Sequence, residues 1–191
     1  MSMGMHLRNS SAEYGIVAQG FHWLTVLLVI AAWLLGIFDD VLPRGSARAA
    51  GLFVHISAGI AILSLLVARF AWRLGDPPPP AAETPFGVWG DRASRMVHYA
   101  LYILLVAVGV AGVLVQFARG NALPVFGLFE IASPWSANRS FARSMKDVHE
   151  VLANTLVILA VLHAAAALAH HWLLRDRTLL RMLPWSGRWS L

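Results

Sequence analysis

The chain has 191 residues, of which 58% are apolar and only 13% are charged, about half the charged share usual in a soluble domain. This composition excludes an intrinsically disordered chain, which needs low hydrophobicity and high charge. The sequence contains no cysteine, which excludes disulfide scaffolds, thiolate zinc sites, iron–sulfur clusters and covalent c-type haem attachment.

Four apolar stretches follow one another along the chain, and each approaches the roughly 20 residues that cross a bilayer core. They cover about residues 21–38, 52–70, 97–117 and 151–172. Only a helix satisfies its backbone hydrogen bonds within one segment in lipid, so we predict an all-α membrane protein with a four-transmembrane-helix bundle. The expected helices cover about residues 16–38, 47–72, 92–118 and 143–173, in a single domain over residues 1–191. The first stretch is too long and begins too late for a signal peptide.

Lys and Arg residues are distributed unequally between the two ends of this predicted bundle. The side with the N-terminus, the second link and the C-terminus holds nine, namely Arg8, Arg69, Arg73, Arg92, Arg95, Arg175, Arg177, Arg181 and Arg188. The other side holds six, namely Arg44, Arg48, Arg119, Arg139, Arg143 and Lys146. The positive-inside rule therefore predicts cytoplasmic termini in a multi-pass inner-membrane protein. The net charge of +5 is then a topology signal, and no nucleic-acid partner is expected.

Seven of the eight histidines lie within or at the ends of the predicted spans, where ionisable side chains are costly and therefore candidates for function. These are His22, His55, His98, His149, His163, His170 and His171. At a rise of about 1.5 Å per residue, His55 and His149 fall in the outer half of the membrane and His22 and His163 in the inner half. Each layer then has one histidine from each of two helices, as a bis-histidine b-type haem requires.

Spacing alone does not decide which histidine forms the inner pair with His22. His98 begins the third predicted span on the inner side, and His170 lies one heptad beyond His163 on nearly the same face. By position along the helix, either one fits the inner pair in place of His163. His98, His170 and His171 lie near the interface, where polar side chains are tolerated, and they are candidates for contacts with a quinone or with haem propionates. A single membrane histidine is explained equally well by an interhelical hydrogen bond. The two depth-matched pairs are what favour haem.

Two further groups of residues have structural interpretations. Arg69 and Arg73 are expected to extend from the inner end of the second span towards water. Gly109 and Gly112 are expected to allow close packing of the third helix against its neighbours.

Several motifs resemble the bacterial cytochrome b561 family, and together they cover nearly the whole chain. The first predicted helix opens with AQGFHWL at residues 18–24, and the second contains FVHISAG at residues 53–59, followed by a Pro-rich link at residues 77–80. The fourth begins with SMKDVHEVLAN at residues 144–154 and ends with LHAAAALAHH at residues 162–171, followed by LLRM at residues 179–182.

The resemblance implies two haem b groups in a four-helix membrane cytochrome, with His22, His55, His149 and His163 as axial ligands of the iron. It also implies a quinone-linked electron carrier. The chain is similar to the superoxide oxidase type within the family, which passes electrons from superoxide outside to ubiquinone. Arg139, Arg143 and Lys146 precede the outer ligand His149 and are candidates for a patch that attracts the anion. Solvated loop charges and anchors for haem propionates are the alternative interpretations of these three residues.

Two other functions remain as alternatives. One is a membrane-anchor cytochrome b subunit that passes electrons between quinone and a partner dehydrogenase or hydrogenase. The other is a haem-free transporter or helical scaffold, which the number of histidines in the spans disfavours.

Overall fold

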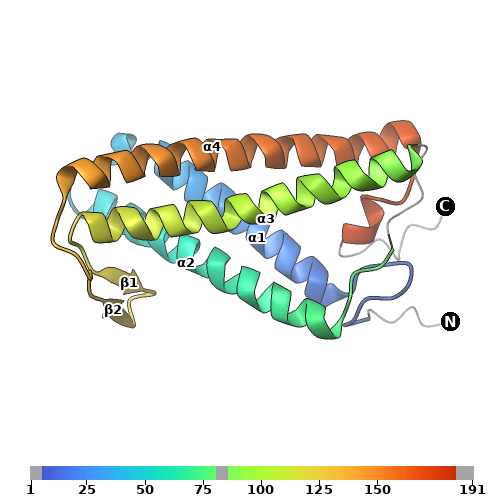
Figure 1. Ribbon diagram of the computed structural model, residues 1–191, viewed down its shortest axis with the longest axis horizontal. Coiled ribbons are helices and arrows are strands. Elements are labelled where there is room, and N and C mark those ends of the chain that lie inside the picture. The colour runs from blue at the N-terminus through green and yellow to red at the C-terminus, as the bar shows by residue number, and fades with distance from the viewer. Residues whose placement is uncertain (1–5, 81–85, 184–191) are drawn as a thin grey trace.

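The computed structural model describes residues 6–80 and 86–183, so Arg188 of the charge count lies outside the described residues. Four long helices run in alternating directions: α1 (Ile16–Ile37), α2 (Ser46–Gly75), α3 (Gly87–Ala118) and α4 (Arg139–Ala169) (Figure 1). All four are long and apolar enough to cross a membrane. The predicted four-helix membrane bundle is therefore confirmed.

The helices extend beyond the apolar stretches that predicted them. α3 begins at Gly87 and α4 at Arg139, several residues before the expected starts, because their first turns carry polar residues that a hydropathy pattern does not register. At α4 the start is set by Asn138, whose side-chain oxygen accepts a hydrogen bond from the amide of Phe141 at 3.0 Å. Such an N-cap satisfies one of the free amides of the first helical turn.

The helices associate as two pairs. The most extensive contacts join α1 to α2 and α3 to α4, and the pairs meet mainly where α2 packs against α3. A cluster of buried leucines and an isoleucine forms the centre of the bundle, namely Ile62, Leu66, Leu105 and Leu156. Leu156 lies seven residues from both His149 and His163 along α4. This buried cluster therefore lies between the two predicted histidine layers.

One end of the bundle, here called the hairpin end, carries a small antiparallel sheet of β1 (Leu123–Val125) and β2 (Phe129–Ile131) (Figure 1). A short 3₁₀ turn (Asp39–Val41) links α1 to α2 at the same end. At the opposite end, here called the terminal end, α1 begins, α4 ends, and α2 is joined to α3.

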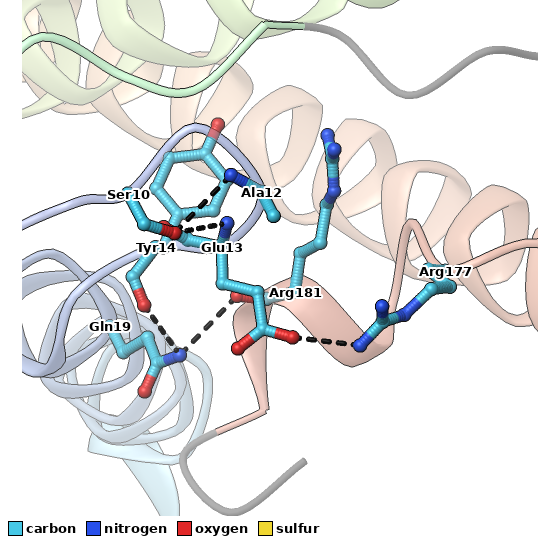
Figure 2. A network of polar contacts seen from close by, with 7 residues as sticks. All are labelled: Ser10, Ala12, Glu13, Tyr14, Gln19, Arg177 and Arg181. Carbon is cyan, nitrogen blue, oxygen red and sulfur yellow. Dashed lines mark hydrogen bonds and ion pairs between the residues drawn. The ribbon is translucent and has the colours of Figure 1, made fainter. Parts of the chain in front are cut away.

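The terminal end is held together by polar contacts between segments far apart in the sequence (Figure 2). The Gln19 side chain donates hydrogen bonds to the carbonyl oxygens of Tyr14 and Arg181, and Arg177 forms an ion pair with Glu13 at 2.7 Å. α4 ends in a single π-helical turn (His170–Leu174), and a 3₁₀ turn (Leu180–Met182) follows. The segment after α4 is thus folded back onto the start of α1.

Candidate functional site

The predicted outer histidines meet between α2 and α4 near the hairpin end. The ring centroids of His55 and His149 are 6.0 Å apart, and the ring planes are inclined by 70°. An imidazole nitrogen binds a transition metal at about 2 Å and lies roughly 1 Å from its own ring centroid, so two rings on opposite sides of one metal have centroids about 6 Å apart. The observed separation therefore fits a single iron held between these two side chains.

Both outer imidazoles are oriented by backbone carbonyl groups of a neighbouring helix. His55 Nδ1 lies 2.8 Å from the carbonyl oxygen of Ala32 on α1, and His149 Nδ1 lies 3.0 Å from that of Val108 on α3. Since a carbonyl only accepts, each Nδ1 carries the proton and each Nε2 keeps its lone pair. This is the tautomer that a metal-ligating histidine needs, and such an outer partner also fixes the ring orientation.

A glycine lies against each of the two imidazole rings, in ordinary contact distance at Gly36 and in a tighter contact at Gly112. A Cβ atom at Gly36 would lie 3.5 Å from His55 Cε1, and one at Gly112 would lie 3.2 Å from His149 Cε1. Gly36 follows Ala32 by four residues and Gly112 follows Val108 by four, so each glycine lies on the same helix face as the acceptor carbonyl, one turn further on. The same arrangement occurs twice, once for each outer histidine.

The expected close packing of α3 at Gly109 and Gly112 is confirmed. A Cβ atom at Gly109 would come within 2.7 Å of the Leu63 side chain of α2, and one at Gly112 would meet the His149 ring of α4. Gly36 was not recognised in the sequence, although its spacing from Ala32 equals that between Val108 and Gly112.

The inner layer contains three histidines from three helices. The ring centroids of His98 and His163 are 5.1 Å apart at 72°, and His22 lies within electrostatic range of both. His98 lies eleven residues into α3, roughly 17 Å from its start. The His98 ring therefore lies level with that of His163, and its distance from the membrane interface stays a prediction.

Two arginines lie beside this layer. The guanidinium carbons of Arg69 and Arg73 each lie 5.4 Å from the ring centroid of Tyr102 on α3, a cation–π geometry. Arg69 also acts electrostatically on His22. Both side chains are half-buried. They pack over an aromatic ring rather than simply extending from the helix end, and they bring positive charge to the inner layer.

The remaining predicted histidines lie in the π-helical turn at the end of α4. His170 Nδ1 pairs with Asp176 Oδ2 at 2.5 Å, and the amide of Thr178 donates to Asp176 Oδ1 at 2.8 Å. Burial raises the pKa of Asp176, but the hydrogen bonds from His170 and Thr178 outweigh it and leave the pKa of Asp176 below its usual value. The ring of His171 instead lies near that of Trp172. π-Helical turns are frequent at functional sites.

The three basic residues before His149 differ in their surroundings. Lys146 forms an ion pair with Glu150 at 2.6 Å, which compensates its charge. Arg139 and Arg143 are exposed, and neither has an acidic partner among the described residues. Of these three residues, Arg139 and Arg143 therefore carry the positive charge that no ion pair compensates among the described residues.

Comparison with known proteins identifies the family. The family model for prokaryotic cytochrome b561 matches residues 13–185. The chain belongs to this family. It is 37% identical over 172 residues to a probable superoxide oxidase CybB of Yersinia pestis, covering 90% of this chain and 96% of the relative. It is 34% identical over 182 residues to cytochrome b561 homolog 2 of Escherichia coli, covering 94% and 95%. A cytochrome b562 of Cereibacter sphaeroides is 27% identical over 167 residues, covering 85% and 89%.

Membership of the cytochrome b561 family establishes the general function. The protein is a multi-pass protein of the bacterial inner membrane that binds haem b and transfers electrons across the membrane. The paired histidines, their carbonyl partners and the glycines against their rings are chemically suited to that cofactor.

Substituting Gly112 by alanine tests the role of the glycines in this cytochrome. The added methyl group would press on the His149 ring at 3.2 Å and tilt it away from the Val108 carbonyl. Loss of an outer partner of a metal-bound histidine typically costs about 10- to 100-fold in affinity. We expect partial loss of haem on purification and a shifted midpoint potential for the haem that remains, measured by redox titration.

The matched control is Gly20→Ala on α1, where a Cβ atom would meet no heavy atom within 4 Å. This variant should keep the haem content and both potentials of the unsubstituted protein. Identical titrations for Gly112→Ala and Gly20→Ala would contradict the proposed role of Gly112.

Proposed function

We propose that this cytochrome b561 transfers electrons from superoxide at the hairpin end to ubiquinone at the terminal end, through two b haems that are each held by two histidines. The observation that carries the proposal is the outer pair, His55 and His149, with a 6.0 Å separation and both Nδ1 atoms engaged by carbonyl groups. The relative named as a probable superoxide oxidase supports the choice of donor.

In this proposal His55 and His149 are the axial ligands of the outer haem, and His22 and His163 those of the inner haem. Arg69 and Arg73 would supply positive charge to the carboxylates of the inner haem, since they lie over Tyr102 beside His22. When bound, haem b supplies reversible one-electron transfer, while the protein sets its position, potential and access.

The charge distribution supports a periplasmic hairpin end. Among the described residues the terminal end carries eight arginines, and the hairpin end carries six Lys or Arg residues. The eight are Arg8, Arg69, Arg73, Arg92, Arg95, Arg175, Arg177 and Arg181. The positive-inside rule then gives cytoplasmic termini.

Arg139 and Arg143 would attract the anionic donor to the outer site. Two superoxide anions each lose one electron and leave as dioxygen, and ubiquinone takes up two electrons and two protons to become ubiquinol. Uncompensated charges at a site mouth raise the local concentration of an oppositely charged substrate. Lys146 contributes less, because Glu150 compensates it.

The pair of His170 and Asp176 would hold a proton for the quinone. Asp176 accepts from His170 Nδ1, which leaves Nε2 as the group that faces a substrate and exchanges the proton. His98 and His171 are the other candidates for quinone contact at this end. An imidazole oriented by a carboxylate is a common arrangement for proton transfer.

A double variant, Arg139→Gln with Arg143→Gln, tests the donor. The purified protein is mixed with enzymatically generated superoxide and a ubiquinone analogue, and haem reduction and quinol formation are followed optically. We expect the second-order rate constant to fall by about tenfold at low ionic strength and to lose most of its salt dependence, because steering by exposed charges is screened by salt.

Arg92→Gln at the terminal end, where the guanidinium lies over Trp89, removes a positive charge on the other side and should leave the rate unchanged. If superoxide does not reduce the unsubstituted protein and a redox protein co-purifies with it, the chain is a membrane-anchor cytochrome b subunit instead. The family-level function of transmembrane electron transfer holds in both cases.

A further inference from the structure

The hairpin of residues 123–131 carries an apolar surface that the proposed electron-transfer path does not use. The register of the two strands pairs Leu123 with Ile131 and Val125 with Phe129, which places all four side chains on one face of the sheet. Leu123 is buried against the bundle, whereas Phe129 and Ile131 are exposed. The turn adds Phe126 and Leu128, and Leu128 is 80% exposed. This surface is therefore apolar and only partly covered.

The turn itself retains an aromatic residue in an unfavourable backbone conformation. Phe126 and Gly127 have φ angles of 53° and 71°, and the amide of Leu128 donates to the carbonyl of Val125 at 2.9 Å. Two successive positive φ angles in a hairpin turn favour Asn, Asp or Gly, and a bulky residue there is a genuine outlier. Because the ring of Phe126 is exposed, packing within the protein does not account for it, which points to a role outside the fold.

The height of the turn along the bundle indicates what it contacts. Between Arg48 and Arg69, α2 has no Asp, Glu, Lys or Arg, and this segment of about 30 Å matches the hydrocarbon thickness of a bilayer. A Cβ atom at Gly127 would lie 3.4 Å from the Phe53 ring. Phe53 is five residues beyond Arg48, roughly 7 Å along the helix axis. Helical side chains tilt towards the helix N-terminus, so the tip of the Phe53 ring, which the turn meets, lies close to this boundary. In Figure 1 the hairpin accordingly folds back beside α2.

We propose that the hairpin is a membrane-surface anchor that places Phe126, Leu128 and Phe129 in the boundary between acyl chains and headgroups. Lipid is the occupant because the exposed surface continues the lipid-facing side of α2 at Phe53 and lies at the height of the membrane boundary. Segments that lie in the membrane interface bury Trp, Phe and Leu side chains about 5–10 Å into the boundary between headgroups and acyl chains. The unpaired strand edges keep the hairpin from entering the hydrocarbon further, since their backbone groups need water. The proposal does not depend on the electron donor or acceptor.

A fluorescent probe measures the depth directly, because the chain has no cysteine of its own. Leu128→Cys is labelled with an environment-sensitive nitrobenzoxadiazole dye, and the full haem-loaded protein is placed in phosphatidylcholine nanodiscs with lipids brominated near the headgroup. We expect blue-shifted emission and quenching several-fold stronger than at Glu130→Cys. Glu130 is the matched control, because it pairs with Pro124 on the opposite face of the hairpin.

A second variant removes the aromatic ring of the proposed anchor but keeps the backbone of the turn. Phe126→Asn, in the Leu128→Cys background, suits the left-handed backbone better and should keep the hairpin folded while quenching at residue 128 falls. Haem absorption and monodisperse elution equal to those of the unsubstituted protein confirm folding. Water-like emission and equal quenching at residues 128 and 130 would overturn the proposal and assign the surface to a protein partner. Unchanged quenching in Phe126→Asn would overturn the role of the ring.

Discussion

Substitution of His149 by alanine is expected to remove one haem and leave the other in place. His149 and His55 face each other at 6.0 Å between ring centroids, and each is oriented by its own carbonyl partner. An iron that needs two axial imidazoles loses half of its protein ligands in this variant. Haem content per chain, measured as the pyridine haemochrome, should fall by about half, and one of two low-spin signals should disappear from the electron paramagnetic resonance spectrum.

Two further variants make the assignment of the outer pair specific. His55→Ala should remove the same signal as His149→Ala, because the two residues hold the same iron in this proposal. His6→Ala, which alters a histidine before the start of α1, should keep the full haem content. Loss of different signals in His55→Ala and His149→Ala would refute the pairing.

The outer layer was predictable because it depends on position along helices. His55 and His149 are expected at one depth from the helix rise alone, and the fixed geometry of α-helices makes that estimate accurate. The carbonyl partners were not predictable in the same way, because a backbone oxygen has no signature in the sequence. A glycine follows Ala32 and Val108 by four residues, where each imidazole ring lies against the neighbouring helix. These glycines can be linked to the histidines only when it is known which helices are neighbours.

Several features of the terminal end could not be predicted from hydropathy. α3 begins before its apolar stretch, where a hydropathy pattern does not register a helix. The contact between the rings of His98 and His163 depends on how α3 packs against α4, which hydropathy does not give. The contact between His170 and Asp176 depends on a π-helical turn and on the left-handed backbone of Arg175. Neither is encoded by periodicity, because each arises from how the chain leaves α4 and folds back onto α1.

Substitution of His163 by alanine is expected to remove the inner haem, whereas His98→Ala should keep both haems and change only the potential of one. The rings of His98 and His163 are 5.1 Å apart, about 1 Å less than two imidazoles on one metal require. His22, on α1, lies within electrostatic range of His163. With His98 set aside, His22 is the second histidine of the inner pair.

The measurement that separates the inner candidates compares His163→Ala, His98→Ala and His170→Ala in one series of haem assays and redox titrations. His163 and His149 are fourteen residues apart on α4, about 21 Å along the axis, which lets one helix serve both layers from a single face. His98 lies on α3 rather than on that face of α4, and His170 lies seven residues beyond His163, about 10 Å further along the axis. Full haem content in His163→Ala together with loss in His98→Ala would transfer the ligand role to His98.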